Sequence, residues 1–254
     1  MKKWKQALFI ILIIVGVLVV SAVVIGILNA TVFDGKINFG WTDYRYENSG
    51  YNVGEGTVYA TEITSIDVDW LDGKVEIVSC EDAYLSISEQ ATEVLAESAQ
   101  VHWMLSADGK TLSIKSRESG WFFGNATEKN LTVRIPERML SQLTNLSVKA
   151  EEAPITVTDI YAPTVTLSAQ KGNVVYSNQE CPRALTVNCD AGDVKLKLAQ
   201  NESFILTWER KQGRLISDFV MREEGNLYTV SDGKNKISVH SGTGDLALSA
   251  LPAK

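Results

Sequence analysis

The segment Leu185-Thr-Val-Asn-Cys-Asp-Ala-Gly-Asp-Val-Lys-Leu196 is the most informative part of the sequence, because its pattern occurs five times in the 254 residues of the chain. Positions 1, 3, 10 and 12 of this 12-residue unit are apolar in every copy, and positions 2 and 4 are polar. Such alternation is typical of a β-strand with one buried face. Each copy therefore predicts two strands joined by a corner. The copies are Ile66–Ile77, Leu146–Val157, Val165–Tyr176, Leu185–Leu196 and Ile237–Leu248.

Glycine stands at position 8 in four of the five copies, as Gly73, Gly172, Gly192 and Gly244. Glycine tolerates positive φ, so it predicts a sharp structural corner between the two strands. The second copy has Ala153-Pro154 instead, and its corner must use ordinary φ values.

The spacing of the copies favours stacked β rungs. The second, third and fourth copies start 19 and 20 residues apart, and a short period of this kind indicates a solenoid. Position 5 is small in four copies, which predicts a recurring inward slot for Ala150, Ala169, Cys189 and Ser241. An antiparallel meander is the alternative, since Gly-Asp and Asp-Gly also occur in hairpins.

Three further segments have the pattern of ordinary hairpins, with alternating strands around a glycine-containing turn. They pair residues 101–106 with 111–116, 204–208 with 214–217, and 227–230 with 236–239.

The N-terminus predicts a membrane anchor. Residues 7–28 form an uncharged apolar run of 22 residues, long enough as a helix to cross a bilayer. Lys2, Lys3 and Lys5 precede the run, so residues 1–6 form a cytoplasmic stub and the body lies outside the cytoplasm. A cleaved signal peptide is the alternative, but its apolar region is normally 7–15 residues long.

Charge and composition limit the possible partners. Without residues 1–28 the chain keeps 21 basic and 31 acidic residues, a net charge of −10. Anionic lipid headgroups repel such a body, which should stand off the membrane. The pI of about 5.0 disfavours nucleic-acid binding. Residues 29–62, rich in Gly, Asn, Tyr and Thr, predict a juxtamembrane spacer with one short strand near Thr57–Thr61. The solenoid then covers residues 63–251.

The chain resembles a bacterial family, the putative-adhesin or toast-rack domain. The resemblance rests on the segments Ser65–Ile77 and Leu131–Pro136, on the Gly-Asn and Gly-Asp corners, and on Gly242–Leu248. It covers about residues 53–250. It implies an all-β solenoid related to single-stranded β-helices, on a membrane-tethered protein outside the cytoplasm. Some relatives are suspected of adhesion and some accompany envelope-stress regulators. The family has no established catalytic residues to carry over.

Few residues suggest chemistry. His102 and His240 have no acid or cysteine at ligand spacing, so they are interpreted as solvated strand histidines. Asp67, Asp69 and Glu76 lie at outward positions, where paired carboxylates could act on a polysaccharide or bind Ca²⁺. A solvated charged face is the favoured interpretation, and Asp72 suits a turn. No cofactor, metal site or catalytic residue is predicted.

Three cysteines are present, at positions 80, 181 and 189. Cys189 fits the small inward slot as a buried thiol. A Cys181–Cys189 disulfide is the alternative, because disulfides persist outside the cytoplasm.

The segment Gly120-Trp-Phe-Phe-Gly124 places Trp121, Phe122 and Phe123 between polar flanks, which predicts a loop. The rings either cap the open end of the solenoid or form a contact loop for a protein, glycan or lipid surface.

These patterns predict a non-enzymatic interaction module, a membrane-anchored adhesin with a protein or envelope-polymer partner. An accessory or sensor protein of an envelope-stress system is the alternative, and its activity should depend on the helix at residues 7–28. A polysaccharide-active enzyme ranks third and would lose activity when Asp67 and Asp69 become Asn.

Overall fold

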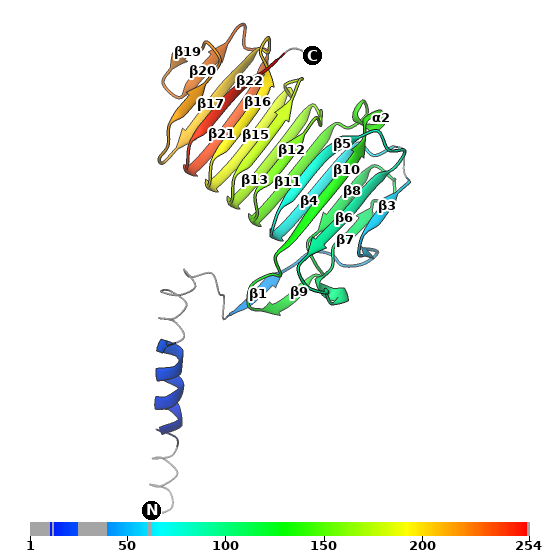
Figure 1. The fold of residues 1–254 in the computed structure, drawn as a ribbon, viewed down its shortest axis with the longest axis vertical. Helices are drawn as coiled ribbons and strands as arrows, with labels where there is room; N and C mark the ends of the chain where they lie inside the picture. The colour runs from blue at the N-terminus through cyan, green and yellow to red at the C-terminus, as the bar shows by residue number, and fades with distance from the viewer. Residues whose placement is uncertain (1–10, 12, 25–39, 60–61, 253–254) are drawn as a thin grey trace, which may run out of the picture. The chain divides into compact units, whose positions relative to one another are not determined.

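The computed structural model describes residues 11, 13–24, 40–59 and 62–252. Two compact units divide them. One contains the described residues up to Tyr46 together with Ser119–Asn125, and the other contains the described residues of Glu47–Glu118 and from Ala126 onward. The first unit carries a two-stranded antiparallel sheet of β1 (Trp41–Tyr44) and β9 (Gly120–Phe123). The second unit consists of two larger sheets (Figure 1).

The order of strands across each large sheet, with their bounds, defines the second unit. The nine-stranded sheet runs β18 (Leu215–Ser217), β22 (Leu246–Leu251), β16 (Val194–Ala199), β14 (Val174–Asn178), β12 (Ile155–Thr158), β5 (Val75–Cys80), β10 (Lys129–Pro136), β6 (Leu85–Ala91) and β3 (Gly56–Val58). The eleven-stranded sheet runs β19 (Arg222–Glu224), β20 (Leu227–Val230), β17 (Phe204–Arg210), β21 (Asn235–Thr243), β15 (Ala184–Ala191), β13 (Thr164–Lys171), β11 (Asn145–Glu152), β4 (Ser65–Asp72), β8 (Thr111–Lys115), β7 (His102–Leu105) and β2 (Asn52–Val53). A 3-10 turn, η1 (Glu97–Ala99), and a short helix, α2 (Glu137–Leu140), lie in the connections.

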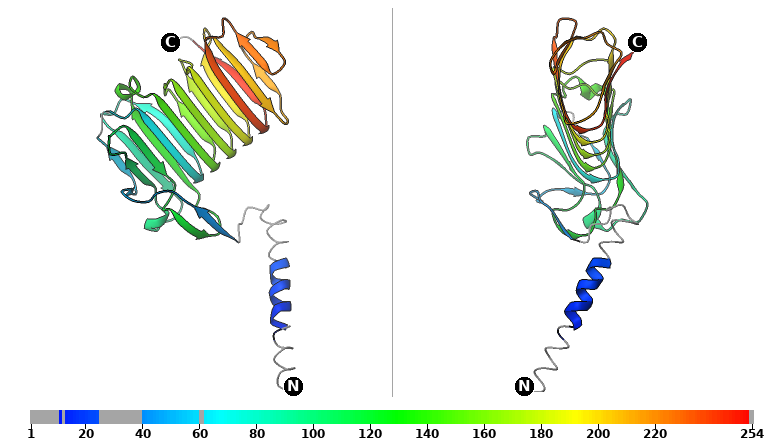
Figure 2. Two further views of the ribbon diagram at one scale, coloured as in Figure 1. Left: turned by 180° about the vertical axis from the view of Figure 1, so that it is seen from behind. Right: turned by 90° about the vertical axis from the view of Figure 1, so that its left-hand side faces the viewer.

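The five copies of the repeat are rungs of a solenoid, as predicted. Each copy contributes one strand to each of the two large sheets. Equivalent positions of neighbouring copies align: Val165 lies beside Leu146 on one side and beside Leu185 on the other. All these neighbours are parallel, which excludes the meander. The buried apolar residues of both sheets form one core. The right-hand view of Figure 2 looks nearly along the stack of rungs.

Two of the three predicted hairpins are wrong. Strands β7 and β8 do pair antiparallel. Strands β17 and β18, however, lie in opposite sheets and form a further rung over β21 and β22, with Gly213 at its corner. Strand β20 pairs with β17 and is separated from β21 by it. A glycine-containing turn marks both a hairpin and a rung corner, so the local pattern is ambiguous.

The corner glycines have the predicted backbone conformation. Their φ values are +99° at Gly73, +125° at Gly172, +149° at Gly192 and +119° at Gly244. Close stacking adds a second reason for glycine: a Cβ on Gly192 would lie 2.4 Å from the carbonyl oxygen of Gly172. Among the described residues, positive φ outside glycine occurs only at Asp159 and Ser231, so the Ala153 corner uses ordinary values, as expected.

The residues after three of the corner glycines, Asn173, Asp193 and Asp245, join neighbouring rungs through a ladder of side-chain hydrogen bonds. The side-chain oxygen of Asn173 accepts from the backbone N–H of Asp193 at 2.8 Å, and Asp193 accepts from the N–H of Asp245 at 2.8 Å. Asp245 accepts from the N–H of Arg214 at 2.9 Å and from its guanidinium. These bonds hold the pKa of Asp245 below its usual range.

The predicted spacer over residues 29–62 contains strands β1, β2 and β3, and β3 covers the start of the strand expected near Thr57–Thr61. The stub at residues 1–6 lies outside the described residues, as does part of the predicted span at 7–28. Residues 13–24 are helical, with exposed apolar side chains. No helix within the described residues is both long and apolar enough to cross a membrane.

Candidate functional site

The predicted contact loop is a strand. Residues 120–123 form β9, which pairs antiparallel with β1 so that Trp41 faces Phe123 and Asp43 faces Trp121. We call this two-stranded sheet the ribbon. Alternation places successive side chains on opposite faces of the ribbon, which explains why three adjacent aromatic residues have different exposures. The prediction of a loop is wrong. The partner strand β1 is distant in sequence, so the residues around 120–123 do not reveal the pairing.

One face of the ribbon is aromatic and open to solvent. Its large side chains are Trp41, Trp121 and Phe123, which are 68%, 59% and 61% exposed. The Trp41 and Phe123 rings meet edge to face with centroids 5.6 Å apart. The Arg45 guanidinium lies 5.5 Å from the centroid of Trp121 and also pairs with Asp43. We call these three rings with Arg45 the aromatic face.

The opposite face of the ribbon is buried. Phe122 is only 8% exposed and Tyr44 only 6%. Tyr44 packs edge-on against Tyr46, with ring centroids 5.6 Å apart. Phe122 is therefore a core residue, and only Trp121 and Phe123 of the predicted trio can contact a partner. Whether these rings also cap the solenoid stays a prediction.

Sequence analysis missed Trp41 and Arg45. Both lie in the segment assigned to a spacer, where only the short alternation of Trp41 to Tyr44 indicates a strand. Four residues are too few for periodicity to distinguish a strand from a turn-rich linker.

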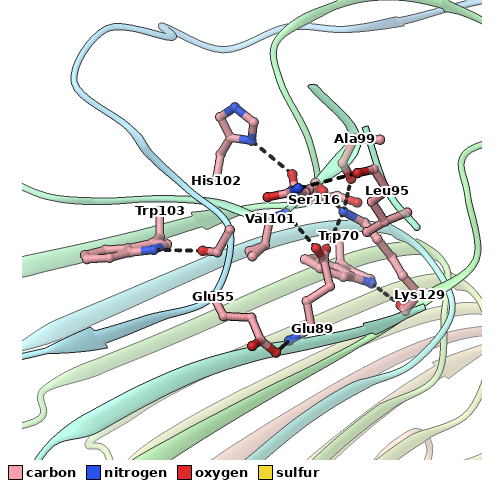
Figure 3. A network of polar contacts seen from close by, with 12 residues as sticks. Glu55, Trp70, Glu89, Leu95, Ala99, Val101, His102, Trp103, Ser116 and Lys129 are labelled. Atoms are coloured by element: carbon pink, nitrogen blue, oxygen red, sulfur yellow. Dashed lines mark hydrogen bonds and ion pairs between the residues drawn. The ribbon is translucent and has the colours of Figure 1, made fainter. Parts of the chain in front are cut away.

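The chain leaves the solenoid after β8, forms β9 of the ribbon, and returns to the solenoid at β10. The buried Lys129, at the start of β10, contacts the residue that follows β8. The Lys129 ammonium donates to the carbonyl oxygen of Ser116, to that of Ala99 at 2.5 Å, and lies 2.6 Å from the Glu89 carboxylate (Figure 3). These three contacts match the three donors of an ammonium group. Burial lowers the pKa of Lys129, while Glu89 opposes that shift.

Neighbouring groups hold Lys129 and Glu89, the two partners of this ion pair, in place. The second Glu89 oxygen accepts from the backbone N–H of Val101 at 3.1 Å, and the Trp70 indole donates to the Lys129 carbonyl oxygen at 3.0 Å. The ammonium also lies 4.8 Å from the Trp70 ring centroid. Figure 3 shows Glu89, Trp70, Ala99 and Ser116 gathered around Lys129. We interpret this network as structural, because the ammonium group of Lys129 already has a partner for each of its three donors.

The outward carboxylates of the first rung are paired with lysines. Lys115 lies 3.5 Å from Asp67 and 3.7 Å from Asp69, and Lys149 lies 3.8 Å from Asp69. Glu76 pairs with Lys74 at 2.8 Å.

Asp72 has the predicted turn role, since its carboxylate accepts from the Gly73 N–H at 2.7 Å. Partial burial raises the pKa of Asp72. In the described part of the chain no three His, Cys, Asp or Glu residues gather as a metal site would require.

The two histidines differ. His240 is outward as predicted, and its Nδ1 lies 3.0 Å from Glu209. His102 is buried, contrary to prediction, and its Nδ1 lies 3.0 Å from the carbonyl oxygen of Gln100. Alternation along one strand separates its two faces but does not tell which face other segments cover.

All three cysteines are free thiols, so the alternative of a Cys181–Cys189 disulfide is wrong. Cys189 fills the inward slot between Ala169 and Ser241 in neighbouring rungs. Burial raises the pKa of Cys189 to about 11 and that of Cys181 to about 12, which makes both thiols poor nucleophiles.

Comparison with known proteins gives a family and a fold. The family model described as Toastrack DUF4097 matches residues 63–184 and 141–249. No curated protein matches the sequence. A crystal structure described as a putative cell adhesion protein from Clostridium sporogenes has a TM-score of 0.60 at 13% identity, over 79% of this chain and 100% of that chain. One described as a putative adhesin from Bacteroides fragilis has a TM-score of 0.35 at 10% identity, over 78% and 97%.

Proposed function

Because the chain belongs to the Toastrack DUF4097 family, we propose that it is a non-enzymatic binding protein of the cell surface or envelope. Residues 7–28 anchor it in a membrane with the N-terminus in the cytoplasm, and the solenoid stands outside. The aromatic face of the ribbon is its contact surface.

The exposed aromatic face is the observation that carries this proposal. Three large rings lie together on one side of a ribbon of two four-residue strands, each ring more than half exposed. Clustered aromatic residues with an arginine are typical of binding surfaces, since they supply large contact areas at low entropic cost. Nothing in the ribbon's own fold requires them on the open side.

The location outside the cytoplasm has independent support. Lysines precede the apolar run, and the following body carries a net charge of −10. The described helix at residues 13–24 exposes apolar side chains all round, as a lipid-facing helix does. The structurally similar Clostridium sporogenes protein is described as a putative cell adhesion protein, which agrees with a surface role.

The state of the candidate groups supports a non-enzymatic role. Asp67 and Asp69 share Lys115, and the Lys129 ammonium has its donors engaged by Glu89 and carbonyl oxygens. Groups neutralised in this way are poorly suited to proton transfer or nucleophilic attack.

The test is photo-crosslinking in intact cells with a photoreactive residue at position 121. The matched control carries it at Val220, which is 94% exposed on the solenoid. We expect the photoreactive residue at position 121 to form a covalent product with a specific partner, and the one at position 220 to form no such product. Equal products, or none beyond the chain itself, would refute the contact surface.

The same experiment separates an adhesin from an accessory protein. Recovery of a membrane regulator, lost when residues 7–28 are exchanged for another span, would favour the accessory role. A Val220→Cys variant that resists a membrane-impermeant maleimide in intact cells would refute the location.

A further inference from the structure

We infer that the aromatic face rests in the headgroup region of the bilayer that holds residues 7–28, so that the ribbon is a lipid-contacting foot of the protein. This rests on the proposed membrane anchor. It assigns the contact surface one partner chemistry, a phospholipid interface.

The composition of the aromatic face fits such an interface. Tryptophan is enriched at the boundary between hydrocarbon and water, because its ring is apolar while its N–H needs a polar partner. Trp41 and Trp121 present two indoles on one face, with Phe123 packed against the first. Arg45, 5.5 Å from the centroid of Trp121, brings a guanidinium that can bind a lipid phosphate.

Charge distinguishes the ribbon from the rest of the body. The residues after position 28 carry a net charge of −10, which an anionic bilayer surface repels. The two segments that form the ribbon and its ends, residues 40–46 and 119–125, contain one acid, Asp43, and one base, Arg45. The ribbon can therefore approach a membrane without the electrostatic cost that keeps the solenoid away.

Chain connectivity keeps the ribbon at the membrane. Twelve residues separate Leu28 from Trp41. Even fully extended, they span only about 40 Å, so β1 stays within that distance of the end of the anchor. Such tethering gives a high effective concentration, and a weak interfacial contact then suffices.

The size of the face argues against a protein partner. A buried aromatic residue contributes roughly 150–250 Å², so three rings that are about 60% exposed offer roughly 400 Å². A stable protein interface needs about 800 Å² from each side. A lipid surface has no such minimum, since the anchor supplies most of the affinity.

The experiment uses the purified full-length chain in phosphatidylcholine vesicles with a photoreactive residue at position 41. The products are analysed by mass spectrometry for phospholipid adducts. A matched site is position 84: Tyr84 is exposed, lies against Tyr59 at 4.6 Å, and has the Arg138 guanidinium 5.9 Å from its ring centroid. Position 84 therefore also lies in an exposed cluster of aromatic rings and an arginine, but on the solenoid.

We expect abundant phospholipid adducts from position 41 and few from position 84. The double variant Trp121→Ser, Phe123→Ser should reduce the adduct from position 41 about tenfold, because it removes both rings of the aromatic face that remain beside the photoreactive residue. The control variant Tyr59→Ser, Tyr84→Ser should leave it unchanged. Circular dichroism checks that the variants keep their strand content.

Equal adducts from positions 41 and 84, or no effect of the double variant, would overturn the lipid contact. A product that joins two copies of the chain in place of lipid would also overturn it. The proposed function would survive either result, because it is tested separately by the crosslinking partner and by the accessibility of position 220 in cells.

Discussion

The Trp208 indole N–H donates to the Ser241 hydroxyl at 3.0 Å, across the boundary between the last rung and the last copy of the repeat. Ser241 aligns with Cys189 and, further along, with Ala169 and Ala150. These aligned positions form a column of small residues across the rungs. Ser241 supplies a hydroxyl in this column at the place where the buried Trp208 indole needs an acceptor. Ser241→Ala should lower the free energy of unfolding by about 1–3 kcal/mol, since it leaves a buried donor unpaired. Denaturant unfolding measures this.

Trp208→Phe gives the control for that prediction. In the Trp208→Phe background, Ser241→Ala should cost much less, because no indole donor remains. An equal cost in both backgrounds would show that the hydrogen bond contributes nothing.

The stacked corners predict two separable costs for replacing glycine. Gly192→Ala should destabilise by roughly 2–4 kcal/mol, because φ is +149° and the new Cβ would meet the Gly172 carbonyl oxygen at 2.4 Å. Gly225→Ala is the control, with φ at +69° but open space around the Cβ, and should cost about 1 kcal/mol. Thermal and denaturant unfolding compare the two, and equal losses would contradict close stacking of the rungs.

The buried Lys129 predicts a dependence of stability on pH. Its pKa lies below 10.5 in the folded protein, so between that lowered value and 10.5 the unfolded chain binds more protons. Stability should therefore rise with pH across this window and fall as pH falls through the folded pKa. Unfolding free energies from pH 7 to 10 measure the slope.

Substitution of Lys129 isolates that slope. Lys129→Met should remove it and should cost about 3–5 kcal/mol near neutral pH, because the buried Glu89 loses its partner. Lys149→Met, at an exposed site, should keep the slope. Parallel pH profiles for the parent and Lys129→Met would contradict the buried ion pair.

The free cysteines predict a simple pattern of thiol labelling. In the folded protein only Cys80 should react with a maleimide, because it is the only one of the three cysteines that is partly exposed. Cys181 and Cys189 should react only after unfolding, because both are buried with raised pKa values. Mass spectrometry of labelled peptides checks this, and two unlabelled residues joined by a disulfide after unfolding would contradict it.

The repeat was predictable because its signals are local. Alternation around Ile66–Ile77 and the other copies identifies the buried face, and glycine at position 8 marks the corner. Register then follows, since identical units stack most stably with like side chains aligned. This is why Ala150 and Ala169 meet as expected.

The ribbon and the last rung could not be predicted in the same way. Strands β1 and β9 are four residues each and far apart in sequence, so neither shows a period and no local signal pairs them. The turn at Gly213 has the composition of a hairpin, but its strands diverge into two sheets because each pairs with a strand of the fifth copy. Burial of His102 likewise cannot be predicted from the alternation of its own strand, which does not show what lies against each face.

Hydroxyl-radical footprinting in native membranes tests most directly whether the aromatic face is covered in the cell. The chain carries its own references: Trp208 is 1% exposed, and Tyr59 is 67% exposed on the solenoid. With Trp41 and Trp121 covered by a partner, both should be oxidised nearly as slowly as Trp208 while Tyr59 reacts freely. Oxidation of Trp121 several-fold faster than that of Trp208, in keeping with its 59% exposure in the structure, would contradict the account.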